Sequence, residues 1–501
     1  MSIEERALES NKQFWSKENY REQNDGMLLY ENLGFMPQML YPISKVALCL
    51  AKALNLEPGV IMPWRGSKMS ESMCQRQFQI MHYLPIIFIR HLFAFVYVMF
   101  FMDKKGLLVY KKHGNKIGTY MYDAILRKYC RKTLNKLTLK DRIFICYLLS
   151  FYYYYRHLII KYPVKVVVLE DEVYLLGLMY ELCKNHNIVC YSPISLNTYF
   201  LKKHEAKDDF KSNYLTNEIL ERLCNDVNFK EEVKKYFSNR YSGQIEQHDV
   251  LSAYAGKRVS SNEEFVKKYK IDPSKKTVII MSHVFADAPH VYTDALYDDY
   301  WDWFTNSYNC LVNNPGINLL VKEHPSAYLY GEKGVIADFL TEKGMNHIQI
   351  KEDESTLSIL QNVDVVVTCG GTIGIEITYI GKNVVLASKP PYSGLGFTKD
   401  FNDRQSYENY LRNGIQDINL LSEEQRIIAE KAAYVMFCRA DNWSKELELG
   451  GEKIYMGRTY DDSLIYSNML KYNEIALEKQ NVYKVIKSFV DSDYKQLYSG
   501  I

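Results

Sequence analysis

The chain has 501 residues, and its 62 lysines and arginines nearly balance its 60 aspartates and glutamates, which leaves a formal net charge of +2. This balance excludes the strong positive field that draws a protein to nucleic acid, and we expect a small charged ligand instead. Hydrophobic residues make up 47% of the sequence and charged residues 24%, as in soluble globular proteins, and the length predicts about two large domains.

Ten cysteines are scattered between Cys49 and Cys438 without a C-x-x-C pair or a short-spaced Cys/His set. This spacing excludes zinc ribbons and redox dithiols and is typical of reduced, buried thiols. Residues 1–15 are polar and acidic, unlike a secretory signal peptide. We therefore expect a cytoplasmic protein.

Two stretches, 92–102 and 143–155, are strongly apolar. Each is shorter than the roughly 20 residues that a spanning helix needs, so neither is expected to cross a bilayer. The second contains four consecutive tyrosines, 152–155, followed by Arg156 and His157. This combination suits a buried core helix, and the alternative is peripheral contact with the inner face of the cell membrane.

The first half of the chain predicts one clear βαβ unit. Residues 46–54 have helical spacing and 60–62 form a short apolar run. After a region without a clear pattern, residues 164–169 are a continuous β-branched run, 173–185 have helical spacing and 188–191 are apolar again.

Residues 201–276 are dense in charged and amide side chains, which is typical of a solvated helical connector. From Thr277 onward, strand-like and helix-like segments alternate regularly, which predicts a parallel, doubly wound sheet. Its predicted strands are 277–281, 317–321, 347–350, 363–368 and 384–387, and its predicted helices are 297–312, 335–343, 355–361 and 373–379. We therefore predict an α/β chain with an N-terminal domain over 1–270 that includes the connector, a second domain over 271–430, and C-terminal helices over 431–501 that pack back on the first domain.

In a doubly wound sheet, ligands bind beyond the carboxyl ends of the strands, so the residues that follow each strand are the strongest candidates. The first such loop contains His283, Asp287 and His290, which are groups suited to acid–base work or, alternatively, to a polar turn. The second contains Lys322, His324 and Pro325, where the proline ends the strand and fixes the histidine.

The third loop runs from Thr368 to Glu376 and contains Gly370, Gly371 and Thr372. Glycines let backbone N–H groups approach a ligand, and a helix that starts there favours a phosphate. The alternative is a tight structural turn with Thr372 as the N-cap of the helix. The dinucleotide and Walker patterns are absent, so neither an NAD site nor an ATPase is indicated.

Two further segments are weaker candidates. Residues 390–398 are rich in glycine and contain Ser393 and Gly394, which lie either near a bound sugar or in a surface turn. Glu170, Asp171 and Glu172 follow the β-branched run of the first half, where they face a ligand or simply start a helix.

The segments SHVFADAPH, VKEHPSA, VVVTCGGTIGIEITYIGKNVV and SGLGFT, all between Thr277 and Thr398, resemble the bacterial capsule polysaccharide biosynthesis family. Looser similarities are KIGTYMYDAILRK and SNRYSGQ. The better-known members transfer Kdo from a CMP-sugar and have the GT-B fold, in which two Rossmann-like domains face a cleft. The resemblance implies that His324, Pro325 and Thr372 bind the nucleotide and its phosphate.

Glycosyl transfer needs a group that stabilises the departing phosphate and a base that deprotonates the acceptor hydroxyl. We assign the first role to Lys322, His324 and the loop over Gly370, Gly371, Thr372 and Glu376, and the second to Asp287 or His283. His290, Ser393 and Gly394 are the candidates for sugar contacts. No D-x-D acidic pair follows a strand of the second domain, so we expect neither a metal nor a cofactor.

The predicted function is transfer of a sugar from a nucleotide-activated donor to a surface-polysaccharide or lipid-linked glycan acceptor. Two alternatives stay open. A sugar-nucleotide epimerase of related fold needs no acceptor, and a non-catalytic scaffold of polysaccharide assembly shows no stabilisation by nucleotides.

Overall fold

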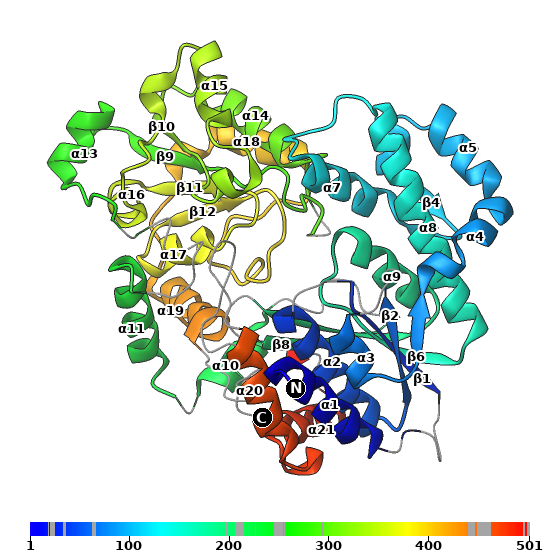
Figure 1. Cartoon of the computed structure of the whole chain (residues 1–501). Coiled ribbons are helices and arrows are strands. Elements are labelled where there is room, and N and C mark those ends of the chain that lie inside the picture. Colours follow the sequence, from blue (N-terminus) through cyan, green and yellow to red (C-terminus); the bar gives the residue numbers. More distant parts are fainter. Residues whose placement is uncertain are drawn as a thin grey trace. The chain divides into compact units, whose positions relative to one another are not determined.

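The structure is a computed structural model that describes residues 1–18, 20, 26–33, 37–62, 67–195, 199–205, 215–225, 227–244, 254, 256–291, 295–438, 446–447, 462–493 and 496–497. The chain forms two compact α/β units (Figure 1). Unit 1 comprises Met1–Tyr122, Lys136–Asn213 and Ala440–Ile501, and unit 2 comprises Asp123–Asn135 and Tyr214–Arg439. Two Rossmann-like units in one chain confirm the predicted fold class.

Unit 1 is built on a seven-stranded sheet of order β13-β8-β7-β6-β1-β2-β3. The five strands from β7 to β3 are parallel, whereas β8 and β13 are antiparallel. The strands are β1 (Met27–Glu31), β2 (Glu57–Met62), β3 (Gln77–Gln79), β6 (Val164–Val168), β7 (Val189–Ser195), β8 (Tyr199–His204) and β13 (Gln496–Leu497). The predicted βαβ unit is present as β6, α9 (Tyr174–Asn185) and β7.

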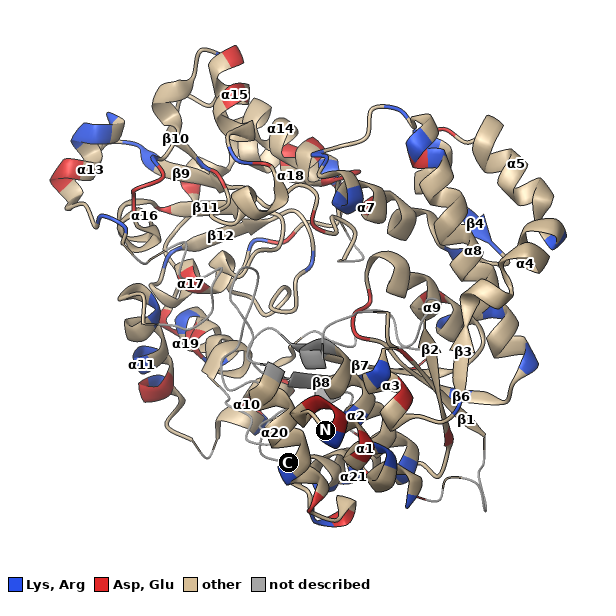
Figure 2. Cartoon of the chain, in the orientation of Figure 1, with Lys and Arg blue, Asp and Glu red and all other residues tan. Residues whose placement is uncertain are grey.

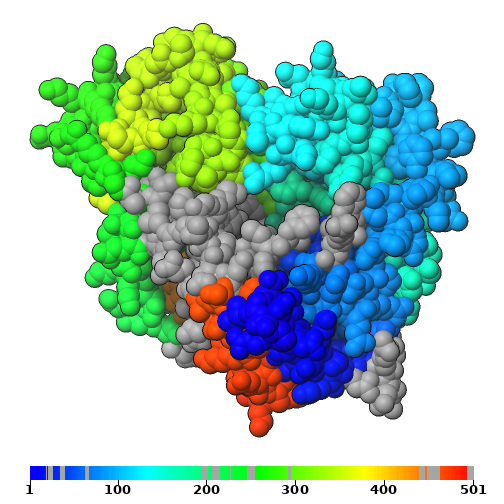
Figure 3. All heavy atoms as spheres, in the orientation of Figure 1, coloured from blue at the N-terminus to red at the C-terminus, as the bar shows by residue number. Residues whose placement is uncertain are grey.

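Helices from both ends of the chain build the core of unit 1. Helix α1 (Ile3–Ser16) packs against α20 (Asp462–Asn473), and α2 (Pro37–Ala53) packs against α21 (Asn481–Val490). Figure 3 shows the dark blue N-terminal residues next to the orange-red C-terminal residues. The C-terminal helices therefore belong to unit 1.

A second group of helices in unit 1 surrounds α8 (Leu139–Lys161). Helices α4 (Leu84–Arg90) and α5 (Leu92–Phe100) pack on it. The other elements of unit 1 are α3 (Lys68–Met73), α6 (Lys104–Leu108), the hairpin β4 (Lys111–Lys112) and β5 (Asn115–Lys116), and α7 (Gly118–Tyr129), whose residues from Asp123 onward group with unit 2.

Helix α8 is longer than we predicted, because Thr138 and Asp141 form a capping box that starts it ahead of the apolar stretch. With 23 residues, it is the one helix in the described part of the chain that is long and apolar enough to span a membrane, and 56% of its apolar window is buried inside the protein. The tyrosines at 152–155 are at most 3% exposed, so they pack inward.

Unit 2 contains a four-stranded, fully parallel sheet of order β10-β9-β11-β12. Its strands are β9 (Lys276–Met281), β10 (Ile317–Lys322), β11 (Val365–Thr368) and β12 (Asn383–Leu386). Its helices are α10 (Asn217–Cys224), α11 (Phe229–Tyr241), α13 (Asn262–Tyr269), α14 (Tyr300–Leu311), α15 (Val335–Glu342), α16 (Thr356–Asn362), α17 (Ile373–Tyr379), α18 (Arg404–Asn413) and α19 (Glu423–Ala433). In register, Lys322 pairs with Met281 and Val367 with Ile280, so three strands end side by side.

The structure differs from the predicted elements in several places. The predicted strand over 347–350 is wrong, because Asn346–Ile348 is a 3-10 helix and only Gln349 bridges to Val321. Helix α2 starts at Pro37 and accommodates Pro42, ahead of the predicted start at 46. Residues 214–270, which we placed with the first domain, group with unit 2, because α10 and α11 pack on α19.

Candidate functional site

Three loops at the carboxyl ends of β9, β10 and β11 are joined by hydrogen bonds. The backbone N–H of His324 donates to Ser282 Oγ over 2.9 Å, which joins the β10 loop to the β9 loop. The backbone N–H of Gly370 donates to His283 Nε2 over 3.2 Å, which joins the β11 loop to the β9 loop. The three loops therefore form one connected group within unit 2.

His283 holds the β11 loop in place. Its Nε2 accepts from Gly370 and also lies 3.2 Å from Thr368 Oγ1, while its ring stacks on Tyr300 with centroids 4.3 Å apart. Burial, together with the nearby His324, lowers its pKa to about 3. Because the ring is neutral and its acceptor nitrogen is occupied, this geometry favours a positioning role over the role of base that we predicted.

His324 presents one defined nitrogen to a ligand. Its Nδ1 accepts the backbone N–H of Ser326 over 3.1 Å, so the proton of the neutral ring lies on Nε2. Burial lowers its pKa to about 4, although the charge of Asp287 acts in the opposite direction. Pro325 directly follows, but β10 already ends at Lys322, so the prediction that the proline ends the strand is wrong. A neutral imidazole held this way is a hydrogen-bond donor that suits a phosphate oxygen.

Lys322 does not take the position that we predicted. It is the last residue of β10, it is buried, and its Nζ donates to the backbone carbonyl of Glu354 over 3.1 Å. Burial and the neighbouring Lys257 lower its pKa to about 8. Its ammonium is thus used to hold the segment before α16.

The glycine loop is fixed by the protein itself. The Gly371 N–H donates to Thr368 Oγ1 over 3.4 Å, and the Tyr392 hydroxyl donates to the Gly371 carbonyl over 2.5 Å. Thr372 stands at the N-cap position of α17, as the structural-turn alternative predicted, but its exposed side chain makes no cap hydrogen bond. Helix α17 has only seven residues, so its dipole contributes less than we expected.

Asp287 lies in a strained and tightly held part of the β9 loop. The next residue, Ala288, has φ of 45°, a left-handed conformation that costs a non-glycine residue about 1–3 kcal/mol. The buried Glu332 accepts from the backbone N–H groups of Phe285 (2.7 Å) and Ala286 (2.8 Å), which holds the preceding turn. The Tyr330 hydroxyl lies 3.4 Å from Asp287 Oδ2. Strain of this kind is typical of functional sites.

Glu332 was not found by sequence reasoning. Burial and the charges of Asp287 and Glu323 raise its pKa to about 7, although the two backbone N–H groups act in the opposite direction. In the sequence it stands in a polar GEKG turn, which gives no sign of a buried carboxyl group.

His290 pairs with a buried acid instead of supporting Asp287. Its Nδ1 lies 2.6 Å from Asp123 Oδ1, and its backbone N–H donates to Asp123 Oδ2 over 3.1 Å. Burial would lower the pKa of His290, but the charge of Asp123 outweighs burial and raises it. The predicted sugar contact for His290 is therefore not favoured by this geometry.

Glu376 is part of an internal ion pair. Arg240 Nη2 donates to Glu376 Oε1 over 2.6 Å, and the Tyr254 hydroxyl donates to the other carboxylate oxygen. All three residues are at most 5% exposed. Arg240 belongs to the SNRYSGQ segment, so the family resemblance of this segment reflects a structural contact. Glu376 was predicted to bind a phosphate, but its carboxylate is occupied by this ion pair.

The segment over 390–398 forms a turn that adjoins the glycine loop through Tyr392. The Ser393 N–H donates to the Pro390 carbonyl over 2.9 Å. Gly394 has φ of 77°, which favours glycine, and its N–H donates to Asp400 Oδ2 over 2.9 Å. Ser393 and Gly394 thus shape the turn, and their contact with a sugar stays a prediction.

Unit 1 has titratable carboxyl groups at its own strand ends. Burial and the neighbouring Asp171 raise the pKa of Glu170 to about 7. Glu31 ends β1 on the adjacent strand, and burial raises its pKa to about 8. Glu172 is instead buried against His204 at 2.6 Å, and its pKa is lowered because Lys202 and His204 outweigh burial. Glu31 was missed because MLLYE reads as an ordinary strand.

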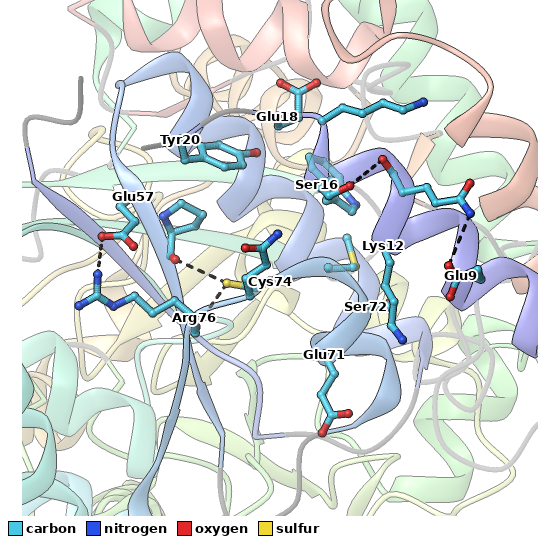
Figure 4. Close-up of a pocket in the computed structure, with 16 residues that line it drawn as sticks. Glu9, Lys12, Ser16, Glu18, Tyr20, Glu57, Glu71, Ser72, Cys74 and Arg76 are labelled. Atoms are coloured by element: carbon cyan, nitrogen blue, oxygen red, sulfur yellow. Dashed lines mark hydrogen bonds and ion pairs between the residues drawn. The ribbon is translucent and has the colours of Figure 1, made fainter. Parts of the chain in front are cut away.

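A cavity of about 830 Å³ lies elsewhere in unit 1 (Figure 4). It is lined by α1, α3 and the first residues of β2. Three of its charged residues are already paired, since Arg76 pairs with Glu57 and Glu18 pairs with Lys52. Because Glu57 starts β2, the cavity lies at the amino end of that strand, away from the edge at which α/β sheets bind ligands. We assign it no part in the chemistry. Across the described residues, no group of three or more His, Cys, Asp or Glu side chains is placed to hold a metal.

Residues 190–439, about half of the chain, match the family model described as capsule polysaccharide biosynthesis protein. The chain belongs to this family. The capsule polysaccharide modification protein LipA of Neisseria meningitidis serogroup A is 32% identical over 129 residues, which cover 26% of this chain and 18% of LipA. The match thus spans less than a fifth of that relative.

Two solved structures of related proteins are also similar to this capsule family member. The β-Kdo 2,4 transferase KpsC of Thermosulfurimonas dismutans is 14% identical, with a TM-score of 0.36, over 61% of this chain and 88% of the other. The UDP-GlcNAc 2-epimerase of Neisseria meningitidis is 10% identical, with a TM-score of 0.23, over 81% of this chain and 96% of the other.

Proposed function

We propose that the protein is a glycosyltransferase that moves a sugar from a nucleotide-activated donor to a surface-polysaccharide or lipid-linked glycan acceptor. The observation that carries the proposal is that the β9, β10 and β11 loops are linked by hydrogen bonds. They bring the fixed Nε2–H of His324 near the charge of Asp287, which precedes the strained Ala288. Family membership supports the same function. We further propose a CMP-sugar donor, a reaction without a metal, and a cytoplasmic location.

In this proposal, His324 donates a hydrogen bond to a phosphate oxygen of the donor and stabilises the charge of the leaving group. Asp287 accepts the proton of the acceptor hydroxyl. His283, Glu332 and Tyr392 keep the three loops in position. Binding of the acceptor by unit 1 belongs to the same proposal.

A panel of CMP, CDP, UDP and GDP in thermal-shift experiments tests the nucleotide site. A ligand present at about 100 times its Kd adds about 2.7 kcal/mol of stability, which is readily measured. Stabilisation by none of the four would favour the scaffold alternative. Product analysis with and without an acceptor separates a transferase from an epimerase, because an epimerase converts its sugar nucleotide alone.

The His324→Ala variant is expected to weaken nucleotide binding by about 1.5–3 kcal/mol, the range for a hydrogen bond to a charged group. Calorimetry on both forms measures the change. His347→Ala is the matched control, because His347 is exposed and lies away from the three loops on a 3-10 helix of the same unit. Equal affinities of the wild type and a folded His324→Ala variant would remove His324 from the site.

The Gly371→Val variant is expected to lower nucleotide affinity at least about tenfold, or about 1.4 kcal/mol, while the sheet stays folded. A Cβ on Gly371 meets Thr368 Oγ1 at 3.3 Å, which small shifts accommodate, whereas the added methyl groups block a phosphate. Gly371→Ala should have a smaller effect. Full affinity in Gly371→Val would mean that the loop is only a structural turn.

A further inference from the structure

Helices α4 and α5 expose a continuous set of large apolar side chains. We call this set the apolar ridge, and its members are 54–90% exposed: Ile86, Phe88, Ile89, Phe93, Phe100 and Phe101. The two helices follow each other directly in the chain, so the six residues lie within 16 positions. An exposed apolar surface of this kind marks contact with a protein or a membrane.

The opposite faces of these helices hold them on unit 1. Ile87, Phe95 and Val98 are buried. The Phe95 ring lies 6.2 Å from that of Tyr153 on α8, and Arg142 Nη1 donates to the Val98 carbonyl over 2.7 Å. The fold therefore already uses the inner faces, and the ridge is not needed for the packing of unit 1.

Positive charge flanks the ridge. In unit 1, residues 72–122 and 136–169 contain 13 lysines and arginines but only two acids, Asp103 and Asp141. Asp141 is buried, where it caps α8. Figure 2 shows that α5 itself carries no charged residue, while the exposed Arg90 precedes it and the exposed Lys105 follows it. Aromatic and aliphatic side chains flanked by cations suit an anionic lipid surface.

We propose that the apolar ridge docks on an anionic membrane leaflet. Its aromatic and aliphatic side chains enter the boundary between headgroups and acyl chains, and Arg90 and Lys105 contact lipid phosphates. A symmetric pair of copies is disfavoured, because a two-fold interface at the ridge brings the flanking cations of one copy to the same interface as those of the other. Helix α5 has nine residues, too few to span a bilayer.

In the sequence, the tyrosines at 152–155 are a candidate for membrane contact, but these residues are buried. The proposed contact is instead made by α4 and α5, which pack on α8. It does not depend on the proposed glycosyl transfer, because lipid binding is measured without substrate. If both are correct, the ridge brings the enzyme to the leaflet that holds a lipid-linked acceptor.

Sedimentation of the full chain with vesicles tests the proposal. The chain should bind phosphatidylcholine vesicles that contain about a third phosphatidylglycerol and should bind pure phosphatidylcholine vesicles at least about tenfold more weakly. Added salt should weaken the anionic binding because it screens the charges. The Ile89→Glu/Phe93→Glu variant should lose binding to anionic vesicles by at least about tenfold, since two apolar side chains no longer enter the lipid.

The matched control is Val259→Glu/Leu420→Glu, which adds the same two charges at exposed apolar positions of unit 2 and should bind vesicles like the wild type. Unchanged melting temperatures establish that the variants are folded. If the Ile89→Glu/Phe93→Glu variant is unstable, the single variant Phe93→Ser replaces it. If the ridge variants bind vesicles as strongly as the wild type does, the proposal is overturned. If the wild type does not bind vesicles but forms a dimer that the ridge substitutions dissociate, the ridge is instead an interface between copies.

Extraction with alkaline carbonate provides a second readout. A docked protein is released from membranes into the supernatant. Retention in the pellet would mean that α8 is inserted as a spanning helix, which would also overturn docking by the ridge.

Discussion

Asp287→Asn is expected to lower kcat by about 10²–10⁴-fold while nucleotide affinity stays close to that of the wild type. The amide keeps the shape of the side chain but cannot accept the proton of a sugar hydroxyl. The surrounding loop should be preserved, because Glu332 holds it through hydrogen bonds from two backbone N–H groups. Steady-state kinetics and calorimetry on the same preparation measure the two quantities.

Asp338→Asn is the matched control, because Asp338 is exposed on α15 of the same unit and should leave kcat unchanged. The competing base is Glu170 in unit 1, whose raised pKa of about 7 also suits proton transfer. If Asp287→Asn kept normal turnover and Glu170→Gln abolished it, the base would belong to unit 1. Loss of nucleotide binding in Asp287→Asn would instead place Asp287 in the donor site.

The Arg240→Met variant is expected to destabilise unit 2 by about 3–5 kcal/mol, the usual effect of leaving one member of a buried ion pair without its partner. Glu376 is 2% exposed, and among the described residues its carboxylate would keep only the hydroxyl of Tyr254 as a donor. Methionine retains most of the volume of the arginine side chain, so the change reports on charge more than on packing. Urea unfolding of both forms measures the difference.

Arg258→Met is the control for this second experiment. Arg258 pairs with Glu264 at 2.8 Å, but both side chains are more than half exposed, so its loss should change stability by less than about 1 kcal/mol. Adding Glu376→Gln to Arg240→Met should restore part of the lost stability, because it removes the unpaired charge. A loss below about 1 kcal/mol in Arg240→Met would show that the pair adds little to unit 2.

The elements of unit 2 were largely predictable, because its buried strands contain continuous β-branched runs such as 365–368, and helices with clear spacing follow several of them. The N-terminal half was harder to predict. The apolar run over 84–102 has polar interruptions only at Arg90 and His91, so it lacks the periodicity that separates two short helices.

The position of the candidate site was predictable from strand ends, but the roles of single side chains were not. His324 lies two residues after the end of β10, where the strand pattern predicted it. Lys322, two residues earlier, turns to the Glu354 carbonyl, and His290 pairs with Asp123, which lies 167 residues away in the sequence. Such partners are brought together only by tertiary packing, and a single sequence does not show them.

The joining of α1 with α20 has a consequence for the order of folding during synthesis. Ala7 and Phe489 belong to the same core, so unit 1 cannot complete that core until residues up to about 489 have left the ribosome. Unit 2 ends at Arg439, so all of its residues emerge earlier. Unit 2 is thus free to fold first, which reverses the usual order in which the N-terminal domain folds first. The N-terminal residues of unit 1 remain without a complete sheet until the C-terminal residues are synthesised. A chaperone that protects nascent apolar surface would be needed most by the residues that are made first.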